Sequence, residues 1–366
     1  MKINCDVLVV GAGPAGLVAS LLLSKKGFSV VILEKNNHIG NASSKFDITE
    51  GHRIKPFLDE LKISPNKISS KSEWISKNNI FILDSKIQDF YFKRGNTSDS
   101  LEHNLYLRLQ KKTDFVTFLF DSEIDSIKTS GDKIEKIISK NNIILPQYVI
   151  FADGGNNGDI LREKNLDIDS SILASFKGFG GTIQSSETKI IPHAKINFDS
   201  NLAPGGYVYS GTIESETFAC IVIDDLFSKK TDLKKNLIQF VKKNFGKTSI
   251  INYFTGKGIS GLKNTSLGNL YFVGGSAFFH DPFLGYGLNY AIESAYYAAQ
   301  SIIEKKDELY KSYSLKIQDE FKKSFFAREI WRKADDNFFD RLISGLNGTY
   351  EPYENDIISI LGLFQG

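Results

Sequence analysis

The stretch from residue 5 to residue 35 constrains the fold of this chain more than any other. It reads CDVLVVGAGPAGLVASLLLSKKGFSVVILEK. An apolar run at residues 7–10 leads into a glycine-rich turn at residues 11–16, and a helix-forming run follows. A second apolar run, at residues 30–33, ends at Glu34. This order predicts a β-α-β unit whose two strands lie parallel and side by side.

The glycines of this turn have the spacing needed to hold a dinucleotide. Gly11 allows the tight turn out of the strand, Gly13 lets a pyrophosphate approach the backbone, and Gly16 lets the helix pack closely on the sheet. The start of the helix offers N–H groups to phosphates, and an acid ending the second strand can bind a ribose hydroxyl. The alternative is a tight strand-to-helix turn that binds no ligand. The residues expected to contact the cofactor are Gly11, Gly13, Pro14, Ala15, Gly16, Glu34 and Lys35.

Composition limits the other classes of function. The chain has 366 residues, 41% hydrophobic and 24% charged, as in a globular protein of two domains or slightly more. A net charge of +2 argues against a nucleic-acid partner. Cys5 and Cys220 are expected to be buried thiols in a reducing compartment, and no metal site is predicted. With no visible signal peptide and no apolar run of about 18 residues, we expect a cytoplasmic protein or one peripheral at a membrane.

The segment after this unit predicts a mixture of helices and strands. Residues 74–94 predict short strands around a turn at Asp84-Ser85, and residues 101–112 predict an amphipathic helix. Residues 115–151 predict successive strands, which is typical of a β-meander inserted in a Rossmann-type sheet. The last of these strands ends in Asp153-Gly154. A turn in that place can reach a ligand at the sheet edge, although an ordinary strand-ending turn is the alternative.

Residues 170–255 predict a mostly antiparallel second domain, interrupted by a helix at residues 232–245. Residues 256–261, GKGISG, repeat the GxGxxG spacing. They are not expected to bind a second dinucleotide, because a poor helix follows them and no later strand ends in an acid.

A second glycine-rich segment follows the strand predicted at residues 269–273. That strand ends at Gly274-Gly275, and a loop containing Asp281-Pro282 and Gly285-Tyr286-Gly287 follows. A long helix rich in small residues is predicted to start near Leu288, so the loop places glycines at a helix N-terminus where backbone can approach a ligand.

In the last part of the chain, apolar residues recur at four-residue steps, at Tyr313, Ile317, Phe321 and Phe325. This spacing predicts a helix packed on the core. The alternative is a face that touches a membrane or covers an apolar substrate.

Three separated segments together resemble a known superfamily. GAGPAG with Glu34, the ADG of residues 152–154, and the DPFLGYGLNYAIESA of residues 281–295 resemble FAD-dependent oxidoreductases of the p-hydroxybenzoate hydroxylase-like superfamily. Within it, the chain is most similar to the geranylgeranyl reductase family. The resemblance implies an α/β fold with three parts. A discontinuous Rossmann-type FAD-binding domain covers residues 1–75, 100–165 and 256–305. A mostly antiparallel β substrate domain covers residues 76–99 and 166–255, and a helical C-terminal segment covers residues 306–366.

The resemblance also implies roles for individual residues. Gly11, Gly13 and Gly16 would hold the FAD pyrophosphate and Glu34 the adenosine ribose. The flavin side would be formed by Asp153, Gly154, Gly274, Asp281, Pro282, Gly285, Gly287 and Leu288. A positive helix end beside the flavin N1–C2=O edge stabilises the anionic reduced form.

The chain departs from the family at three places. Tyr207 and Tyr209 match the start of the family's substrate motif, but Ser210 and Gly211 do not continue it. Most relatives have Asp where this chain has Gly275, so Ser276 or a backbone group would have to replace it. Several reductases have a Cys in the loop after Gly40, where this chain has Ser43 and Ser44.

The resemblance implies an FAD-dependent reductase of C=C bonds in the prenyl chains of isoprenoid lipids. Its partners would be a hydrophobic lipid and an electron donor, either NAD(P)H or a ferredoxin-like protein. The proton would come from solvent or a nearby donor. Tyr207 is the candidate catalytic donor, with an aromatic packed in the sheet as the alternative. Two other functions remain open: a flavin monooxygenase acting on an aromatic or lipophilic molecule, and a flavin-binding protein without turnover.

Overall fold

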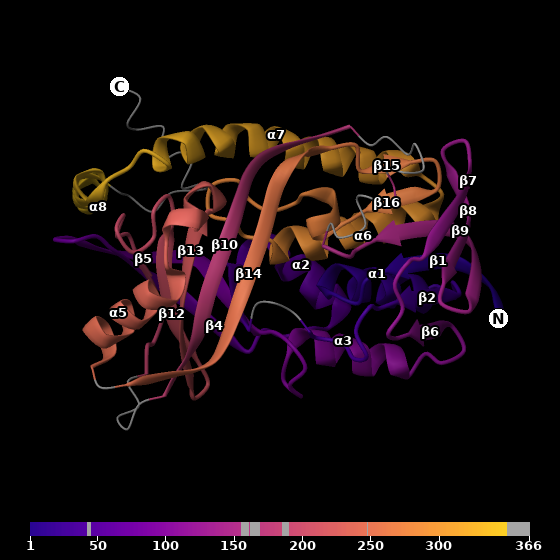
Figure 1. Cartoon of the computed structure of the whole chain (residues 1–366), viewed down its shortest axis with the longest axis horizontal. Helices are drawn as coiled ribbons and strands as arrows, with labels where there is room; N and C mark the ends of the chain where they lie inside the picture. The colour runs from indigo at the N-terminus through magenta and orange to yellow at the C-terminus, as the bar shows by residue number, and fades with distance from the viewer. Residues whose placement is uncertain (42–44, 155–160, 162–168, 185–189, 247, 350–366) are drawn as a thin grey trace.

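The computed structural model describes residues 1–41, 45–154, 161, 169–184, 190–246 and 248–349, apart from the side chains of residues 85–87, 348 and 349. Two eight-stranded sheets stand beside each other, with long helices across one side (Figure 1). The predicted α/β class is confirmed, including the Rossmann-type unit and the helical C-terminal segment. Ser43 and Ser44, named above for the loop after Gly40, lie outside the described residues.

The first sheet is built around the predicted β-α-β unit. β1 (Lys2–Val10) lies parallel to β2 (Val30–Leu33), with Val7 opposite Val30 and Val10 opposite Leu33. The path through the sheet is β15 (Ser266–Leu267), β16 (Leu270–Phe272), β9 (Asn142–Phe151), β1, β2 and β6 (Val116–Leu119). β7 (Ser126–Ser130) and β8 (Lys133–Ser139) form the predicted meander with β9.

Apolar helices cover this sheet. α1 (Pro14–Lys25) packs against both α3 (Leu101–Gln110) and α6 (Leu288–Glu304), and α2 (Gly51–Leu61) packs on α6. Every residue of α1 from Ala15 to Ser24 is buried, which explains why its sequence is apolar all round rather than on one face. α3 and α6 start where the sequence predicts helices.

The second sheet is antiparallel except at one pair of strands, β11 and β4. α5 (Leu233–Phe245) covers one side of it, packing on β13 and β10. The strands, in order across the sheet, are β14 (Ser249–Lys263), β10 (Ser170–Gln184), β13 (Glu216–Asp224), β12 (Tyr207–Ile213), β11 (Ala194–Asn197), β4 (Lys67–Ile75), β5 (Ile80–Lys93) and β3 (Phe46–Glu50).

The membership of the two sheets does not follow the residue ranges expected for the two domains. β3 and β4 lie in residues 1–75, which were assigned to the FAD-binding domain, but both pair in the second sheet. The last part of β14, residues 256–263, also belongs to the second sheet. The expected turn at Asp84-Ser85 is wrong, because both residues lie inside β5 and the chain reverses between residues 75 and 80. Strand pairing between distant segments decides these boundaries, and no local pattern encodes it.

The second GxGxxG segment lies within β14 and has no strand-to-helix turn, which confirms that it does not form a second nucleotide-binding turn. A Cβ at Gly258 would meet the His280 ring at 3.0 Å, and a Cβ at Gly261 would meet the Ser171 carbonyl oxygen at 2.3 Å. These glycines therefore allow close packing against β10 and the following loop.

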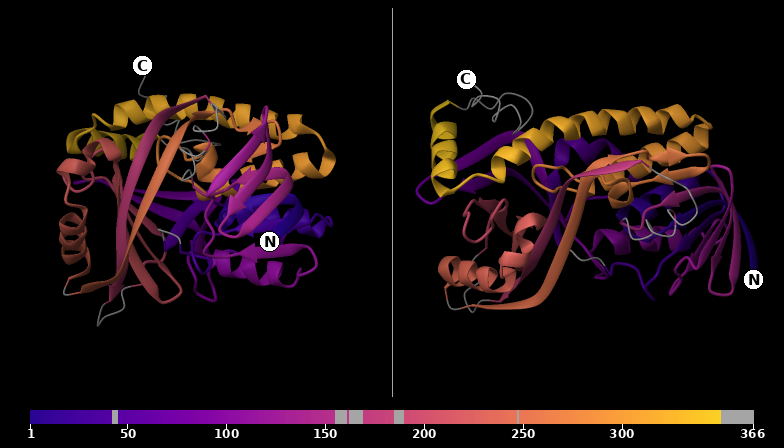
Figure 2. Two further views of the ribbon diagram at one scale, coloured as in Figure 1. Left: turned by 45° about the vertical axis from the view of Figure 1, so that its right-hand side comes forward. Right: turned by 45° about the horizontal axis from the view of Figure 1, so that its top comes forward.

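The C-terminal helices extend over both sheets. α7 (Asp307–Trp331) packs on α6, β14 and β10, and α8 (Asp336–Thr349) packs on β5 (Figure 2). Tyr313, Ile317 and Phe321 are buried, so this part of the predicted helix face packs on the core. No helix among the described residues has the length and apolarity required to cross a bilayer.

Candidate functional site

Of the three glycines in the turn between β1 and α1, only Gly13 has open space beside it. A Cβ at Gly11 would meet the Ala152 carbonyl oxygen at 2.6 Å, and a Cβ at Gly16 would meet the Gly11 carbonyl oxygen at 2.0 Å. A Cβ at Gly13 would meet nothing nearer than 4.0 Å. Gly11 and Gly16 therefore shape the turn, and Gly13 exposes backbone at the first turn of α1, as a pyrophosphate site requires.

Glu34 lies against this turn from the end of β2. Its Oε2 accepts a hydrogen bond from the Ala12 N–H at 2.9 Å, and its Oε1 accepts from the Asn36 amide nitrogen at 2.6 Å. A carboxylate has about four lone-pair sites, so acceptor capacity remains for a ribose hydroxyl. Lys35, the next residue, is exposed.

The ends of three strands meet at the glycine turn. β9 ends beside it, and Gly154 follows with a φ of +73°. A Cβ at Gly275 would lie 3.1 Å from the Gly154 Cα, and a Cβ at Gly274 would lie 3.3 Å from the Ala15 Cβ. The structure therefore brings together the segments around residues 11–16, 153–154 and 274–275, which the sequence singled out separately.

The departure at Gly275 has a local explanation. The close approach to Gly154 leaves little room for a side chain at position 275. The neighbouring Ser276 is buried, and its hydroxyl donates a hydrogen bond to the Asp153 Oδ1. The carboxylate at this junction is thus supplied by Asp153, from the end of β9.

Asp281 builds the loop that precedes α6. Its Oδ1 accepts hydrogen bonds from the backbone N–H groups of Phe283 and Leu284, and its Oδ2 accepts one from the Ser324 hydroxyl of α7 at 2.7 Å. Burial raises the pKa of the Asp281 carboxyl above its ordinary value. These bonds give Asp281 a role in shaping the loop that carries Pro282, Gly285 and Gly287.

His280, beside it, packs between two glycines. A Cβ at Gly287 would meet its ring at 2.5 Å, and its Nδ1 lies 3.1 Å from the Ile259 carbonyl oxygen. Burial lowers the pKa of His280, so the neutral ring fills this space.

The first turn of α6 carries a buried polar group that the sequence reasoning missed. Asn289 follows Leu288 and is 2% exposed, yet its Oδ1 has no hydrogen-bond partner among the described residues. The Thr49 Oγ1 on β3 is also buried and has no hydrogen-bond partner among the described residues. Buried polar atoms normally have partners, so these two atoms fit a site that binds a polar ligand. The position of Asn289, directly after the loop, was the available signal.

The second sheet curls strongly beside this loop. Phe46 on β3 stacks on Phe218 of β13 with ring centroids 4.4 Å apart, although four strands of the sheet lie between them. We call the inner side of this curl the concave face; Tyr91, Cys220 and Phe254 contribute buried side chains to it. Gly178 shares this side, and a Cβ there would meet nothing nearer than the Cys220 Sγ at 3.7 Å. This part of the concave face is therefore aromatic and apolar, and its backbone is open at Gly178.

Tyr207 and Tyr209 both lie on this face, with ring centroids 6.2 Å apart. The Tyr207 hydroxyl donates to the Leu284 carbonyl oxygen at 2.6 Å, and the Tyr209 hydroxyl donates to the Phe46 carbonyl oxygen at 3.5 Å. Burial raises the pKa of both phenols well above the ordinary value. Tyr207 thus connects the second sheet to the loop before α6.

Replacing Tyr207 with phenylalanine tests whether its hydroxyl positions the loop or donates a proton. The Leu284 carbonyl would lose its 2.6 Å partner, so we expect a loss of about 1 kcal/mol in the free energy of unfolding. Turnover should fall by less than about tenfold, because a proton donor would contribute about 10²–10⁴-fold. Urea unfolding measures the change in stability, and steady-state kinetics measure the change in turnover. A fall in turnover of about 100-fold or more would show that Tyr207 is the proton donor.

A buried ion cluster fixes α7 against the same loop. The Arg328 Nη2 and Arg332 Nε donate to the Asp224 Oδ2 at 2.8 Å and 2.7 Å, and the Arg328 Nη1 donates to the Phe283 carbonyl oxygen at 3.3 Å. Burial opposes ionisation of Asp224, but the two guanidinium groups hold the pKa of its carboxyl below the ordinary value. Asp224 and Arg328 are 0% and 1% exposed.

Asp89 on β5 lies opposite Glu50 of β3 in the antiparallel ladder, on the concave side. It forms no ion pair within the described part of the chain, and burial raises the pKa of its carboxyl to about 7.

Because this pKa is higher in the folded than in the unfolded chain, the folded state binds more protons between about pH 4 and pH 7. The contribution of Asp89 to stability therefore falls as the pH rises through that range. We expect Asp89→Asn to be more stable than the wild type at pH 8, by on the order of 2–4 kcal/mol, and similar at pH 4. Denaturant unfolding at both pH values measures the difference; an equal difference at both would contradict the raised pKa.

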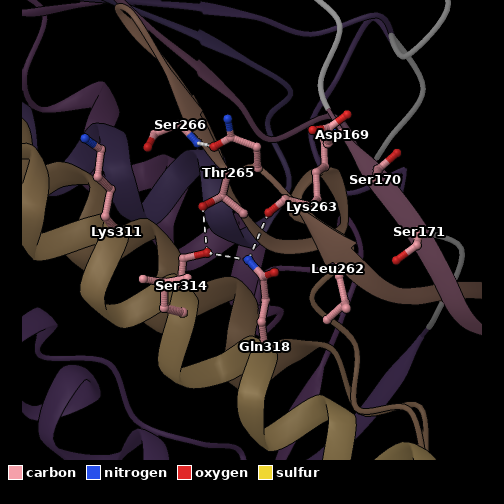
Figure 3. A pocket seen from close by; sticks show the side chains of 12 residues that line it. Asp169, Ser170, Ser171, Leu262, Lys263, Thr265, Ser266, Lys311, Ser314 and Gln318 are labelled. Carbon is pink, nitrogen blue, oxygen red and sulfur yellow. Dashed lines mark hydrogen bonds between the residues drawn. The ribbon is translucent and has the colours of Figure 1, made fainter.

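A surface depression of about 620 Å³ lies elsewhere, between α7 and the ends of β10 and β14 (Figure 3). Most of the residues that line it are polar types, and several of their polar groups bond to one another: the Gln318 Nε2 donates to the Lys263 carbonyl oxygen and to the Ser314 hydroxyl. No aromatic side chain lines it. It does not contain the residues of the site described above.

The chain is similar to known proteins over most of its length. Residues 9–56 match a family model described as an NAD(P)-binding Rossmann-like domain. A digeranylgeranylglycerophospholipid reductase from Methanococcoides burtonii is 28% identical over 353 residues, covering 89% of this chain and 81% of the relative.

Two solved structures share the fold. The crystal structure of a geranylgeranyl bacteriochlorophyll reductase-like protein from Thermoplasma acidophilum has a TM-score of 0.82 at 21% identity, covering 99% of this chain and 96% of the other. The p-nitrophenol 4-monooxygenase of Pseudomonas putida has a TM-score of 0.67 at 15% identity, covering 94% and 95%. The similarity along the sequence and the matching architecture agree with the motifs brought together above. The chain is thus similar in sequence to digeranylgeranylglycerophospholipid reductases, and it shares its fold with a geranylgeranyl bacteriochlorophyll reductase-like protein.

Proposed function

We propose that this protein binds FAD and reduces isolated C=C bonds in the prenyl chains of isoprenoid lipids. The observation that carries the proposal is the junction between the loop at residues 281–287 and the aromatic concave face. Tyr207 joins the two through its bond to the Leu284 carbonyl. A cofactor bound along the glycine turn and this loop would therefore have an apolar surface beside it. The relatives named digeranylgeranylglycerophospholipid reductases support this class of substrate.

The residues present fit FAD along a continuous path. The backbone at Gly13, Pro14, Ala15 and Gly16 would hold the pyrophosphate at the start of α1, and Glu34 would bind the adenosine ribose. Asp153, Gly154 and Gly274 would lie along the ribityl side. Gly285, Gly287 and Leu288 would hold the ring system at the positive end of α6, a helix of 17 residues.

When bound and reduced, the flavin supplies the hydride. The chain itself has three tasks. The backbone at the N-terminus of α6 favours negative charge on the flavin. The concave face excludes water and binds the prenyl chain through apolar contact. Tyr207 and Asp281 hold the loop between these two surfaces.

A single anaerobic experiment tests the proposal. The FAD-loaded protein is reduced with dithionite, a geranylgeranyl lipid is added, and flavin absorbance is followed while the lipid is analysed by mass spectrometry. We expect reoxidation of the flavin together with a lipid that has gained two hydrogens for each double bond reduced. Reoxidation that requires O₂ and yields a hydroxylated product would instead support a monooxygenase. Failure of the protein to bind FAD would exclude both activities.

A further inference from the structure

Two acidic residues face each other on the concave face, beside the loop that precedes α6. Glu50 on β3 and Asp89 on β5 are directly opposite in the antiparallel ladder. Tyr286 lies close to both: burial raises its pKa well above the ordinary value, and the charges of Tyr207, Asp89 and Glu50 raise it further.

Two other acids on this side of the sheet have basic partners. Asp224 binds Arg328 and Arg332, and Glu216 binds Lys93, at 2.8 Å. Asp89, in contrast, forms no ion pair with a described residue. A partly buried carboxyl without a cation is stabilised in its protonated form.

Several charged and titratable groups lie around Asp89. Glu50 faces it from β3, Tyr286 from the loop, and Tyr91 lies two residues along its own strand. Lys67 is opposite Tyr91 on β4, but its Nζ donates to the carbonyl oxygens of Ile191 and Thr212. The ammonium group of Lys67 is thus engaged by two carbonyl oxygens, and burial raises the pKa of the Asp89 carboxyl to about 7, so that much of it keeps its proton near neutral pH.

We propose that Asp89 is the acid that protonates the substrate during reduction of the double bond. The inference rests on the proposed function. With a hydride supplied to one alkene carbon by the bound, reduced cofactor, the Asp89 carboxyl would give its proton to the other carbon, where the π electrons of the double bond would form the new C–H bond. The O–H bond of Asp89 breaks and leaves a carboxylate, which regains a proton from solvent. The alkene is reduced by two electrons and the flavin is oxidised by two.

The position of Asp89 suits this role. It lies on the aromatic side of the sheet, where an apolar chain would bind, and its charge acts on Tyr286 of the loop that would hold the flavin. A general acid works best when its pKa is close to the operating pH. The pKa of about 7 for Asp89 meets this condition.

The test uses the full chain loaded with FAD and reduced under argon. After mixing with a geranylgeranyl lipid, the flavin reoxidation rate of the wild type should fall about tenfold per pH unit above about pH 7, because the acid form is consumed. Asp89→Asn should reoxidise at least about 100-fold more slowly at pH 6 and should lose this pH dependence. Asp89→Glu should recover part of the rate. FAD affinity should be the same in all three proteins.

Asp84→Asn is the matched control. Asp84 lies on the same strand but is exposed, paired with Lys71 at 2.8 Å, so its substitution should leave the rate and its pH profile unchanged. An unchanged rate or an unchanged pH profile in Asp89→Asn would overturn the inference. If that variant does not fold, a flat wild-type profile around pH 7 would overturn it equally. Failure of the wild type to be reoxidised by the lipid at any pH would reject the proposed function itself, and the inference with it.

Discussion

Replacing Asp224 with asparagine is expected to lower the free energy of unfolding by about 3–5 kcal/mol. The substitution removes the negative partner of two guanidinium groups, of which that of Arg328 is only 1% exposed. A buried cation left without its counter-charge is the costly state, since the folded protein cannot return it to water. Urea unfolding followed by circular dichroism measures the loss. Asp319→Asn on α7, where the carboxylate pairs with Lys322 on the surface, is the control and should leave the unfolding midpoint unchanged.

This substitution should also affect the cofactor site. Arg328 donates to the Phe283 carbonyl oxygen, so the cluster links α7 to the loop before α6. We expect FAD affinity to fall in Asp224→Asn even under conditions in which the protein remains folded. Fluorescence titration with FAD well below the melting temperature measures this effect. A variant with normal stability would show that the two arginines find other partners.

Replacing Gly13 with alanine should weaken FAD binding without destabilising the protein before FAD is added. The nearest protein atom to a Cβ at this position lies 4.0 Å away, and the backbone there is in an ordinary extended conformation with φ −77°. The methyl group would occupy the space in which the pyrophosphate is expected to lie. We expect the dissociation constant for FAD to rise by at least about tenfold, which corresponds to about 1.4 kcal/mol. Thermal unfolding of the FAD-free protein should be unchanged.

Gly11→Ala provides the contrast for this experiment. Gly11 has a φ of +102°, and a Cβ there would meet the Ala152 carbonyl oxygen at 2.6 Å. This variant should lose stability with or without FAD, because both the backbone conformation and the close packing exclude a side chain. If Gly13→Ala destabilises the FAD-free protein as Gly11→Ala does, Gly13 shapes the turn and its proposed role in binding the cofactor is wrong.

Much of the architecture could be predicted because its signals are local. The apolar runs around Gly11–Gly16 predicted β1, α1 and β2, and the structure confirms all three. The meander before Asp153 and the start of α6 at Leu288 were also predicted correctly, since alternation, turn residues and helix periodicity lie within a few neighbouring positions. The turn expected at Asp84-Ser85 is wrong because β5 continues through both residues. Pairing with β4, which lies earlier in the chain, keeps this segment extended.

The sequence by itself determined which segments are proposed to hold the cofactor, because glycines at fixed spacing and an acid at a strand end are read directly from the chain. Only the tertiary structure decided what individual side chains do there. It shows that β3 and β4 pair in the second sheet. It also shows that the Asp281 carboxylate accepts hydrogen bonds from backbone N–H groups of its own loop and that the Tyr207 hydroxyl donates to the Leu284 carbonyl oxygen. It also brought Asp89 opposite Glu50 on an aromatic surface. Burial, charge and hydrogen-bond partners depend on residues far apart in the chain, so these roles exist only once the two sheets are assembled.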